Sequence, residues 1–178
     1  MTTTAPATGI TVRAMPQRQR LGDYKLIAFD MDSTLINIEC VDEIADAVGC
    51  KDEVAAITEA AMRGEITDYK DSLRRRVALL RGATVADLEY VYTQRLQLNP
   101  GAQALVQACQ QVGLKTLLVS GGFTFFTERL RQRLRLDFTR SNLLEIASGP
   151  NCGTLTGRIT PQCWGDICDG AEKRRTLL

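Results

Sequence analysis

Two carboxylates spaced two residues apart follow the first apolar run of the chain. Asp30 comes directly after residues 26–29 (Leu-Ile-Ala-Phe), and Asp32 is next but one. The run predicts a strand buried on both faces of a parallel sheet, and ligands bind beyond the carboxyl ends of such strands. In an extended chain this spacing places both carboxylates on one side, where they can share a divalent cation and raise one another's pKa. One carboxylate can then attack a substrate while the other carries a proton.

A second candidate site follows the next apolar run. Residues 114–119 (Leu-Lys-Thr-Leu-Leu-Val) predict another parallel strand, which ends in Ser120-Gly121-Gly122 before a helix from residue 123 to about 134. Backbone N–H groups and a helix N-terminus in such a turn can cradle a phosphate. The same residues could instead form a helix cap and a tight turn. Together with the two carboxylates, the turn favours a phosphate site.

The elements that must position these residues form a βα pattern with an insertion. Apolar residues recur at helical spacing over residues 40–48, 51–63, 67–81 and 84–97, and no strand pattern interrupts them. A helical block of this length between two buried strands is too long for a simple crossover and predicts a lid over the crevice. A further helix is expected over 101–112, and the Gly- and Pro-containing segment after residue 146 predicts a β-hairpin over about 142–160.

The composition excludes several classes of function. With 178 residues, 44% of them hydrophobic, the chain can form one globular core with a small second lobe. Its net charge of +1 gives no electrostatic footprint for nucleic acid or an anionic membrane. The chain has no histidine, which excludes Ser-His-Asp and Cys-His catalysis. The six cysteines include no Cys-x-x-Cys pair, and we interpret them as reduced thiols of a soluble, cytoplasmic protein.

The string Asp-Met-Asp-Ser-Thr after an apolar strand resembles the first motif of the haloacid dehalogenase (HAD) superfamily of phosphohydrolases. The Leu-Ile-Asn-Ile-Glu that follows is similar to the branch that hydrolyses phosphoserine. The resemblance covers residues 25 to 178. It implies an α/β fold with a HAD-like, Rossmann-like parallel sheet formed by residues 24–38 and 98–178. A helical cap, residues 39–97, would be inserted in this core, and residues 1–23 would form a flexible tail, with an edge strand over 9–15 as an option.

The resemblance also assigns roles to the residues of the two candidate sites. Asp30 would be the nucleophile and Asp32 the general acid and base, and both would hold Mg²⁺, Asp32 through its backbone carbonyl. Ser120, Gly121 and Lys173 would bind the phosphate, with the Lys173 ammonium neutralising both phosphate and Asp30. The reaction implied is the Mg²⁺-dependent hydrolysis of O-phospho-L-serine through an aspartyl phosphate, a step of serine biosynthesis.

Phosphoserine carries an ammonium and a carboxylate, so a site that recognises it needs one anionic and one cationic side chain. Glu39 stands where the resembled family binds the ammonium, although an acidic residue at a helix start also has a purely electrostatic use. Of three consecutive arginines, Arg76 falls on the flank of the apolar stripe of its helix, whereas Arg74 and Arg75 point farther away. Arg76 also matches the carboxylate-binding arginine of the family. Two further residues would close over the serine side: Met62 and Tyr69.

The fourth acidic motif of the superfamily should lie beyond Leu178. We do not interpret the acidic loop around Asp166 as this motif, because it precedes Lys173 and follows no apolar strand. We therefore expect a core that is incomplete at the C-terminus, with too few protein oxygens to hold Mg²⁺ firmly and little or no activity in this form. Two alternatives stay open: a phosphatase for another small phosphomonoester, and an inactive phosphate-binding module that takes phosphate on Asp30 without turnover. The expected partner is a small-molecule substrate, not nucleic acid or a membrane.

Overall fold

The computed structural model describes residues 20–178. The predicted tail, residues 1–23, and the edge strand over 9–15 lie outside the described residues, apart from a short 3-10 helix at Leu21–Asp23.

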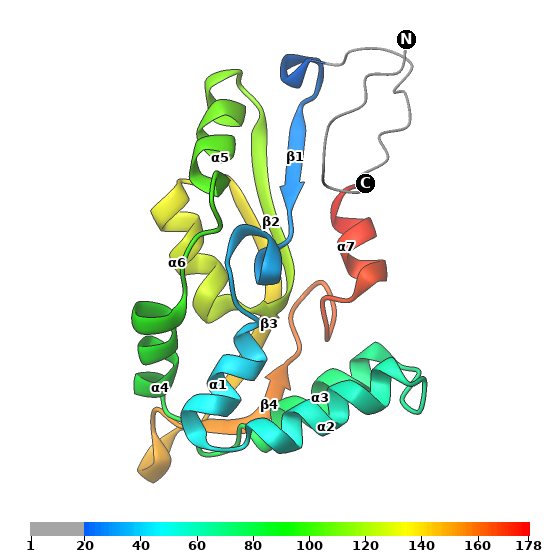
Figure 1. The fold of residues 1–178 in the computed structure, drawn as a ribbon, viewed down its shortest axis with the longest axis vertical. Coiled ribbons are helices and arrows are strands. Elements are labelled where there is room, and N and C mark those ends of the chain that lie inside the picture. Colours follow the sequence, from blue (N-terminus) through cyan, green and yellow to red (C-terminus); the bar gives the residue numbers. More distant parts are fainter. Residues whose placement is uncertain (1–19) are drawn as a thin grey trace, which may run out of the picture.

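A four-stranded sheet runs through the molecule (Figure 1). Its strands are β1 (Leu26–Phe29), β2 (Lys115–Phe123), β3 (Phe138–Ile146) and β4 (Leu155–Thr160), in the order β1-β2-β3-β4. The first three strands are parallel, and β4 pairs antiparallel with β3. The predicted α/β fold with a mainly parallel sheet is confirmed, and β3 and β4 form the predicted hairpin.

Strand β1 is more exposed than its apolar sequence predicts. Only Phe29 is buried, whereas Leu26 is 36% exposed, because β1 lies at the edge of the sheet and pairs with β2 alone among the described strands. The prediction of a strand buried on both faces is therefore wrong for β1. It is correct for β2, whose residues 116–120 are all buried.

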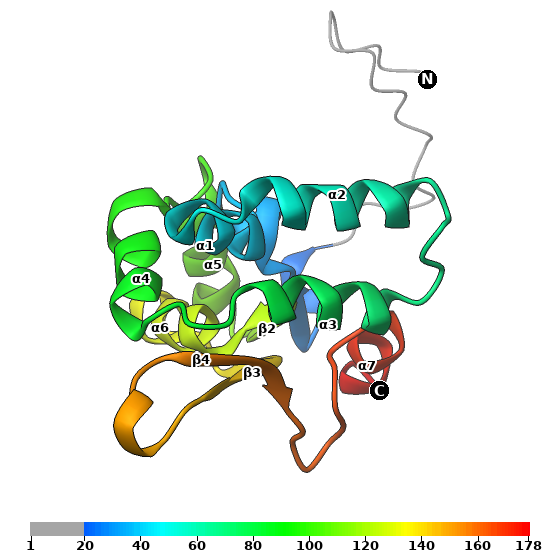
Figure 2. The same cartoon turned by 90° about the horizontal axis from the view of Figure 1, so that it is seen from below.

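Helices cover the two faces of the sheet. Figures 1 and 2 show α5 (Ala102–Gln111) and α6 (Thr124–Leu134) on one face, and α7 (Gly170–Thr176) on the other. Side chains of a strand alternate between faces. Accordingly, Leu118 of β2 belongs to the main core with residues of α5 and α6, whereas Leu117 and Val119 pack with Cys168 on the face of α7.

Four helices gather beyond the carboxyl ends of β1 and β2 (Figures 1 and 2). They are α1 (Cys40–Val48), α2 (Lys51–Met62), α3 (Tyr69–Leu79) and α4 (Val85–Tyr90), the last continued by a π-helical turn at Val91–Arg95. Their order and approximate ranges agree with the sequence prediction. Gly49, with φ +79°, ends α1, and a capping box between Thr84 and Asp87 starts α4. That these helices form a separate cap domain stays a prediction.

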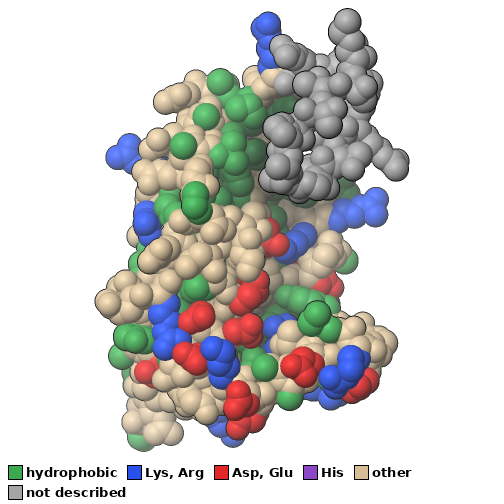
Figure 3. All heavy atoms as spheres, in the orientation of Figure 1, with side chains coloured by type: hydrophobic (Ala, Val, Ile, Leu, Met, Phe, Trp, Pro, Cys, Tyr) green, Lys and Arg blue, Asp and Glu red, His purple; other side chains and the backbone are tan. Residues whose placement is uncertain are grey.

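Acidic and basic side chains alternate on the face drawn in Figure 3, over the lower part that α1 to α3 occupy. The ion pairs of the described residues include Arg95 with Glu43 and Asp46, at 2.8 and 2.5 Å. Within residues 20–178, none of the helices combines the length and apolar character needed to cross a membrane. All six cysteines are free thiols.

Candidate active site

A cavity of about 310 Å³ lies where β1 and β2 end. It brings together eight of the nine residues that the sequence predicts for the site, from five separate segments of the chain. They are Asp30, Asp32, Glu39, Tyr69, Arg76, Ser120, Gly121 and Lys173. The apolar side chains Val41 and Leu73 complete part of its wall.

Asp30 directly follows the last residue of β1, as predicted. One carboxylate oxygen, Oδ1, accepts a hydrogen bond from the backbone N–H of Met31 at 2.9 Å. The other, Oδ2, lies 2.7 Å from the ammonium of Lys173, which α7 carries to this point from 143 residues away. The Asp30 side chain is still 47% exposed, so this paired carboxylate can be reached by a substrate.

Asp32 lies in a turn that is tightened by Ser33, whose φ is +51°. Its Oδ1 accepts a hydrogen bond from the backbone N–H of Cys40, at the start of α1, at 3.2 Å. Burial raises the pKa of Asp32 to about 6, with Glu39 and Asp30 adding to the shift and the hydrogen bonds from Cys40 opposing it. A carboxyl with this pKa can both donate and accept a proton near neutral pH.

The residues Ser120–Gly122 lie within β2, which continues to Phe123, and the register of β2 to β3 shifts over this stretch. The prediction that the strand ends before Ser120 is therefore wrong. We call these three residues the phosphate turn, because the Ser120 side chain is bonded to the backbone two residues on. Ser120 is fully buried, and its Oγ accepts a hydrogen bond from the N–H of Gly122 at 2.8 Å. Both glycines lie close to side chains of the site. A Cβ on Gly121 would collide with the Tyr69 hydroxyl, and one on Gly122 would lie 2.8 Å from Asp32 Oδ2, so in each case a neighbouring side chain would have to move. The sequence suggested a tight turn or a phosphate cradle, but not these contacts.

Glu39 and Arg76 add one anion and one cation to the cavity wall. Glu39 does not cap α1 with its side chain, and instead its Oε1 accepts a hydrogen bond from Ser33 Oγ at 2.6 Å. The Nε of Arg76 is buried and has no hydrogen-bond partner. A buried, unsatisfied guanidinium nitrogen is costly, so this nitrogen is a ready donor for a ligand.

The two neighbouring arginines form ion pairs outside the cavity. Arg74 pairs with Asp166 at 2.5 Å, and Arg75 pairs with Asp71 in the same helix at 2.8 Å. Of the three arginines, Arg76 lines the cavity and the other two do not. The role of Arg76 toward the substrate stays a prediction. Asp166, rejected as a metal ligand from the sequence, also binds Lys70 at 2.9 Å and so ties its loop to α3.

Met62 is the one predicted site residue that the structure does not bring to this cavity. It is the last residue of α2 and is 83% exposed, because the chain turns away there toward α3. It lines an adjoining cavity of about 330 Å³, which shares Tyr69 and Arg76 with the site. Its role toward the substrate stays a prediction.

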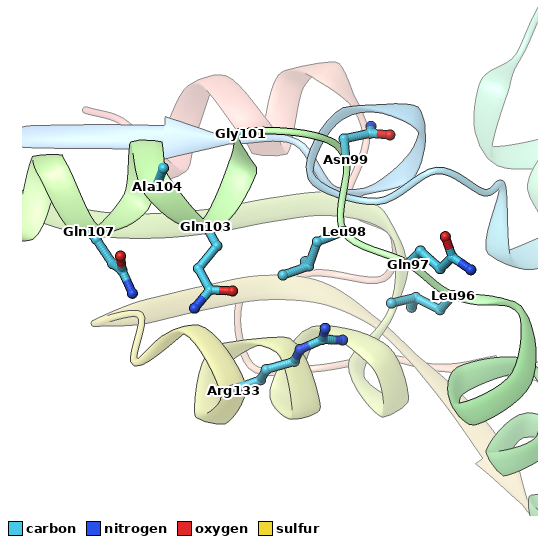
Figure 4. Close-up of a pocket in the computed structure, with 9 residues that line it drawn as sticks. All are labelled: Leu96, Gln97, Leu98, Asn99, Gly101, Gln103, Ala104, Gln107 and Arg133. Atoms are coloured by element: carbon cyan, nitrogen blue, oxygen red, sulfur yellow. The ribbon is translucent and has the colours of Figure 1, made fainter.

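A larger cavity of about 580 Å³ lies between α5 and α6 and the segment before α5 (Figure 4). Its polar side chains include Gln103, Gln107 and Arg133, and its described lining contains no acidic residue, serine or cysteine. It therefore offers no nucleophile and no proton donor of suitable pKa, and the chemistry belongs to the smaller cavity.

The comparison with known proteins agrees with this fold and site. Residues 24–163 match the model of a hydrolase family, the haloacid dehalogenase-like hydrolases. The chain belongs to this family. A solved HAD family hydrolase from Salmonella enterica superposes with a TM-score of 0.76 at 40% identity, over 86% of this chain and 49% of that one.

Within the family, the chain is similar to several phosphoserine phosphatases. Those of Albidiferax ferrireducens and of a Polaromonas species are each 66% identical to this chain, over 98% and 96% of its length. The matches span 72% and 70% of the two relatives. A substrate-bound phosphoserine phosphatase structure is 33% identical with a TM-score of 0.74, over 86% of this chain and 68% of that chain.

The residues of the site can be judged as ligands for Mg²⁺, the ion that the sequence resemblance implies. Asp30 and Asp32 offer the hard oxygens that Mg²⁺ prefers, but one oxygen of Asp30 is held by Lys173 and one of Asp32 by Cys40. Among residues 20–178, no three or more His, Cys, Asp and Glu side chains are grouped so as to hold a metal ion. These residues do not by themselves fit a Mg²⁺ site.

Proposed function

We propose that this chain carries the site of a phosphoserine phosphatase, which hydrolyses O-phospho-L-serine to L-serine and phosphate. One observation carries the proposal: a single cavity holds the Asp30–Lys173 pair and Asp32 together with one further anion, Glu39, and one unsatisfied cation, Arg76. Phosphoserine presents a phosphate, an ammonium and a carboxylate. Lys173 and the phosphate turn would bind the first, Glu39 the second and Arg76 the third.

The first half of the reaction transfers the phosphoryl group to the enzyme. The carboxylate of Asp30 attacks phosphorus, and the bond between phosphorus and the serine oxygen breaks. Asp32 gives its proton to the departing serine oxygen, which its pKa of about 6 permits near neutral pH. Lys173 offsets the negative charge of the nucleophile and of the phosphoryl oxygens, so that two anions can approach each other.

The second half releases phosphate. Asp32, now ionised, takes a proton from a water molecule, whose oxygen attacks the phosphorus of the aspartyl phosphate. The bond between phosphorus and Asp30 breaks, and both carboxyls return to their starting protonation states. An aspartyl phosphate also fits the solved phospho-aspartyl intermediate analogue of a phosphoserine phosphatase, which is 36% identical over 76% of this chain, with a TM-score of 0.67.

Two finer features belong to the same proposal. Mg²⁺ stays a predicted cofactor, to which Asp30 and Asp32 would contribute only part of the ligand set. A cytoplasmic location is proposed because six free cysteines, two of them exposed, suit a reducing compartment.

Ligand binding tests the substrate assignment without depending on turnover. In an Asp30→Asn background, which prevents hydrolysis, the affinity for phosphoserine and for phosphoethanolamine, which lacks the carboxylate, is measured by calorimetry. Arg76→Ala should weaken phosphoserine binding by about tenfold to a hundredfold, the size of a lost hydrogen bond to a charged group. It should leave phosphoethanolamine binding within about twofold.

The matched control is Arg75→Ala, because Arg75 lies next in the same helix and, among residues 20–178, pairs with Asp71 alone. It should leave both affinities within about twofold of the parent. Equal losses for both ligands in Arg76→Ala would mean that Arg76 supports the packing of α3, and the assignment of phosphoserine would then be wrong.

A further inference from the structure

The phosphate turn and the segment that carries Lys173 are joined by one buried side chain, that of Asn142 in β3. Asn142 has no exposed surface. Its Nδ2 donates a hydrogen bond to the carbonyl oxygen of Gly121 at 2.7 Å, and its Oδ1 accepts one from the backbone N–H of Cys168 at 2.7 Å. The Asn142 amide thus bonds to two segments at once. Its NH2 group donates to a residue 21 positions earlier, and its oxygen accepts from a residue 26 positions later.

In the proposed function, each of the two segments contributes a group that binds the substrate phosphate. Gly121 lies between Ser120 and Gly122, which are themselves joined by a hydrogen bond. Cys168 comes immediately before Asp169, whose side chain caps α7 by accepting the N–H of Glu172 at 2.8 Å. Because α7 is only seven residues long, the position of Cys168 sets where Lys173 meets Asp30.

The two bonds of Asn142 leave little freedom to other residue types. An aliphatic side chain of similar size would leave the Gly121 carbonyl and the Cys168 N–H buried without this partner, which is unfavourable for both. Aspartate could still accept from Cys168, but it would bring a second acceptor against the Gly121 carbonyl. The carboxamide meets both demands at once.

We propose that Asn142 is a positioning residue that fixes the spacing between the phosphate turn and Lys173. The inference rests on the proposed function, since it assumes that both segments bind one phosphoryl group. Asn142 is not among the residues that line the cavity. Its loss should therefore weaken all phosphate ligands by the same factor and leave the discrimination made by Glu39 and Arg76 unchanged.

The matched control is Ser141→Ala. Ser141 is the preceding residue of β3, is also buried, and hydrogen-bonds Thr127 of α6 at 2.7 Å, away from the site. Asn142→Leu and Ser141→Ala are compared in the Asp30→Asn background for binding of inorganic phosphate, phosphoserine and phosphoethanolamine. We expect Asn142→Leu to weaken all three at least tenfold by a common factor, and Ser141→Ala to change none by more than about twofold. Should Asn142→Leu not fold, Asn142→Asp, which keeps the volume and one acceptor, carries the same comparison with a loss of at least threefold.

Amide hydrogen exchange of the ligand-free chain gives a second measurement that does not depend on function. In Asn142→Leu, the Cys168 and Lys173 amides should exchange at least tenfold faster than in Ser141→Ala. A folded Asn142 variant that binds phosphate as the parent does, or whose α7 amides stay protected, would overturn the inference. If the parent binds neither phosphate nor phosphoserine, the proposed function fails instead, and the exchange rates alone decide whether Asn142 fixes α7.

Discussion

At the scale of single residues, the two motif carboxylates owe their different chemistry to their surroundings. Asp30 is paired with an ammonium and half exposed, whereas Asp32 has one backbone donor and a pKa raised by burial to about 6. An exposed carboxylate paired with an ammonium suits a nucleophile, and a buried carboxyl with a raised pKa suits a proton donor. The assignment of roles by sequence resemblance thus has a physical basis in the structure, although the roles themselves stay proposals.

The raised pKa of Asp32 predicts how its replacement changes stability with pH. Because its pKa is higher in the folded chain than the ordinary 3.8, the folded state binds the proton more tightly. Asp32 therefore costs nothing below about pH 4, its cost grows as pH rises from about 4 to about 6, and it stays at its full size above that. Asp32→Asn should raise the free energy of unfolding at pH 8 by at most about 3 kcal/mol, at about 1.4 kcal/mol per pKa unit, and much less at pH 4. Urea unfolding at both pH values measures this, and a gain that does not depend on pH would contradict a raised pKa.

At the scale of elements, α3 reaches the phosphate turn through Tyr69 and Gly121. A methyl group at Gly121 would collide with the Tyr69 hydroxyl and lie 3.3 Å from Cζ of its ring, so Gly121→Ala must displace Tyr69 from the cavity wall. We expect Gly121→Ala to weaken phosphoserine binding about tenfold in the parent but no more than about threefold in a Tyr69→Phe background, a coupling typical of residues in contact. Losses that simply add in the double variant would show that the collision does not govern binding.

How far the sequence predicts these elements depends on the range of the interactions. Asp30 could be predicted from the sequence because it stands at the end of an apolar strand, whereas Lys173 was assigned only by the resemblance to the family. Asn142 was missed because a polar residue within a strand carries no signal of its own, and its partners are set by the register of β2 and β3. The sequence of a strand also does not show whether it lies at the edge or in the centre of a sheet. For this reason the exposure of β1 was wrongly predicted. Similarly, the predicted helix over 84–97 is divided after Tyr90 by a π-helical turn.

At the scale of the whole molecule, the ligand set predicts weak magnesium binding by these 178 residues. Millimolar Mg²⁺ should raise the melting temperature by less than about 1 °C, since an ion stabilises a fold only when its concentration well exceeds the dissociation constant. Thermal unfolding with Mg²⁺ and with EDTA measures the shift. Asp166→Asn serves as the control, because Asp166 is paired with Lys70 and Arg74. A large shift that this variant abolishes would show that Asp166 is a ligand after all.

The substrate phosphate is proposed to pass through a covalent bond to Asp30, and borohydride trapping tests this central claim most directly. The chain is incubated with phosphoserine, quenched and reduced, which converts an aspartyl phosphate to homoserine, and the modified residue is located by mass spectrometry. We predict homoserine at position 30 and none in Asp30→Asn, even where turnover is slow. Homoserine at position 32, or phosphate release that persists in Asp30→Asn, would contradict the claim.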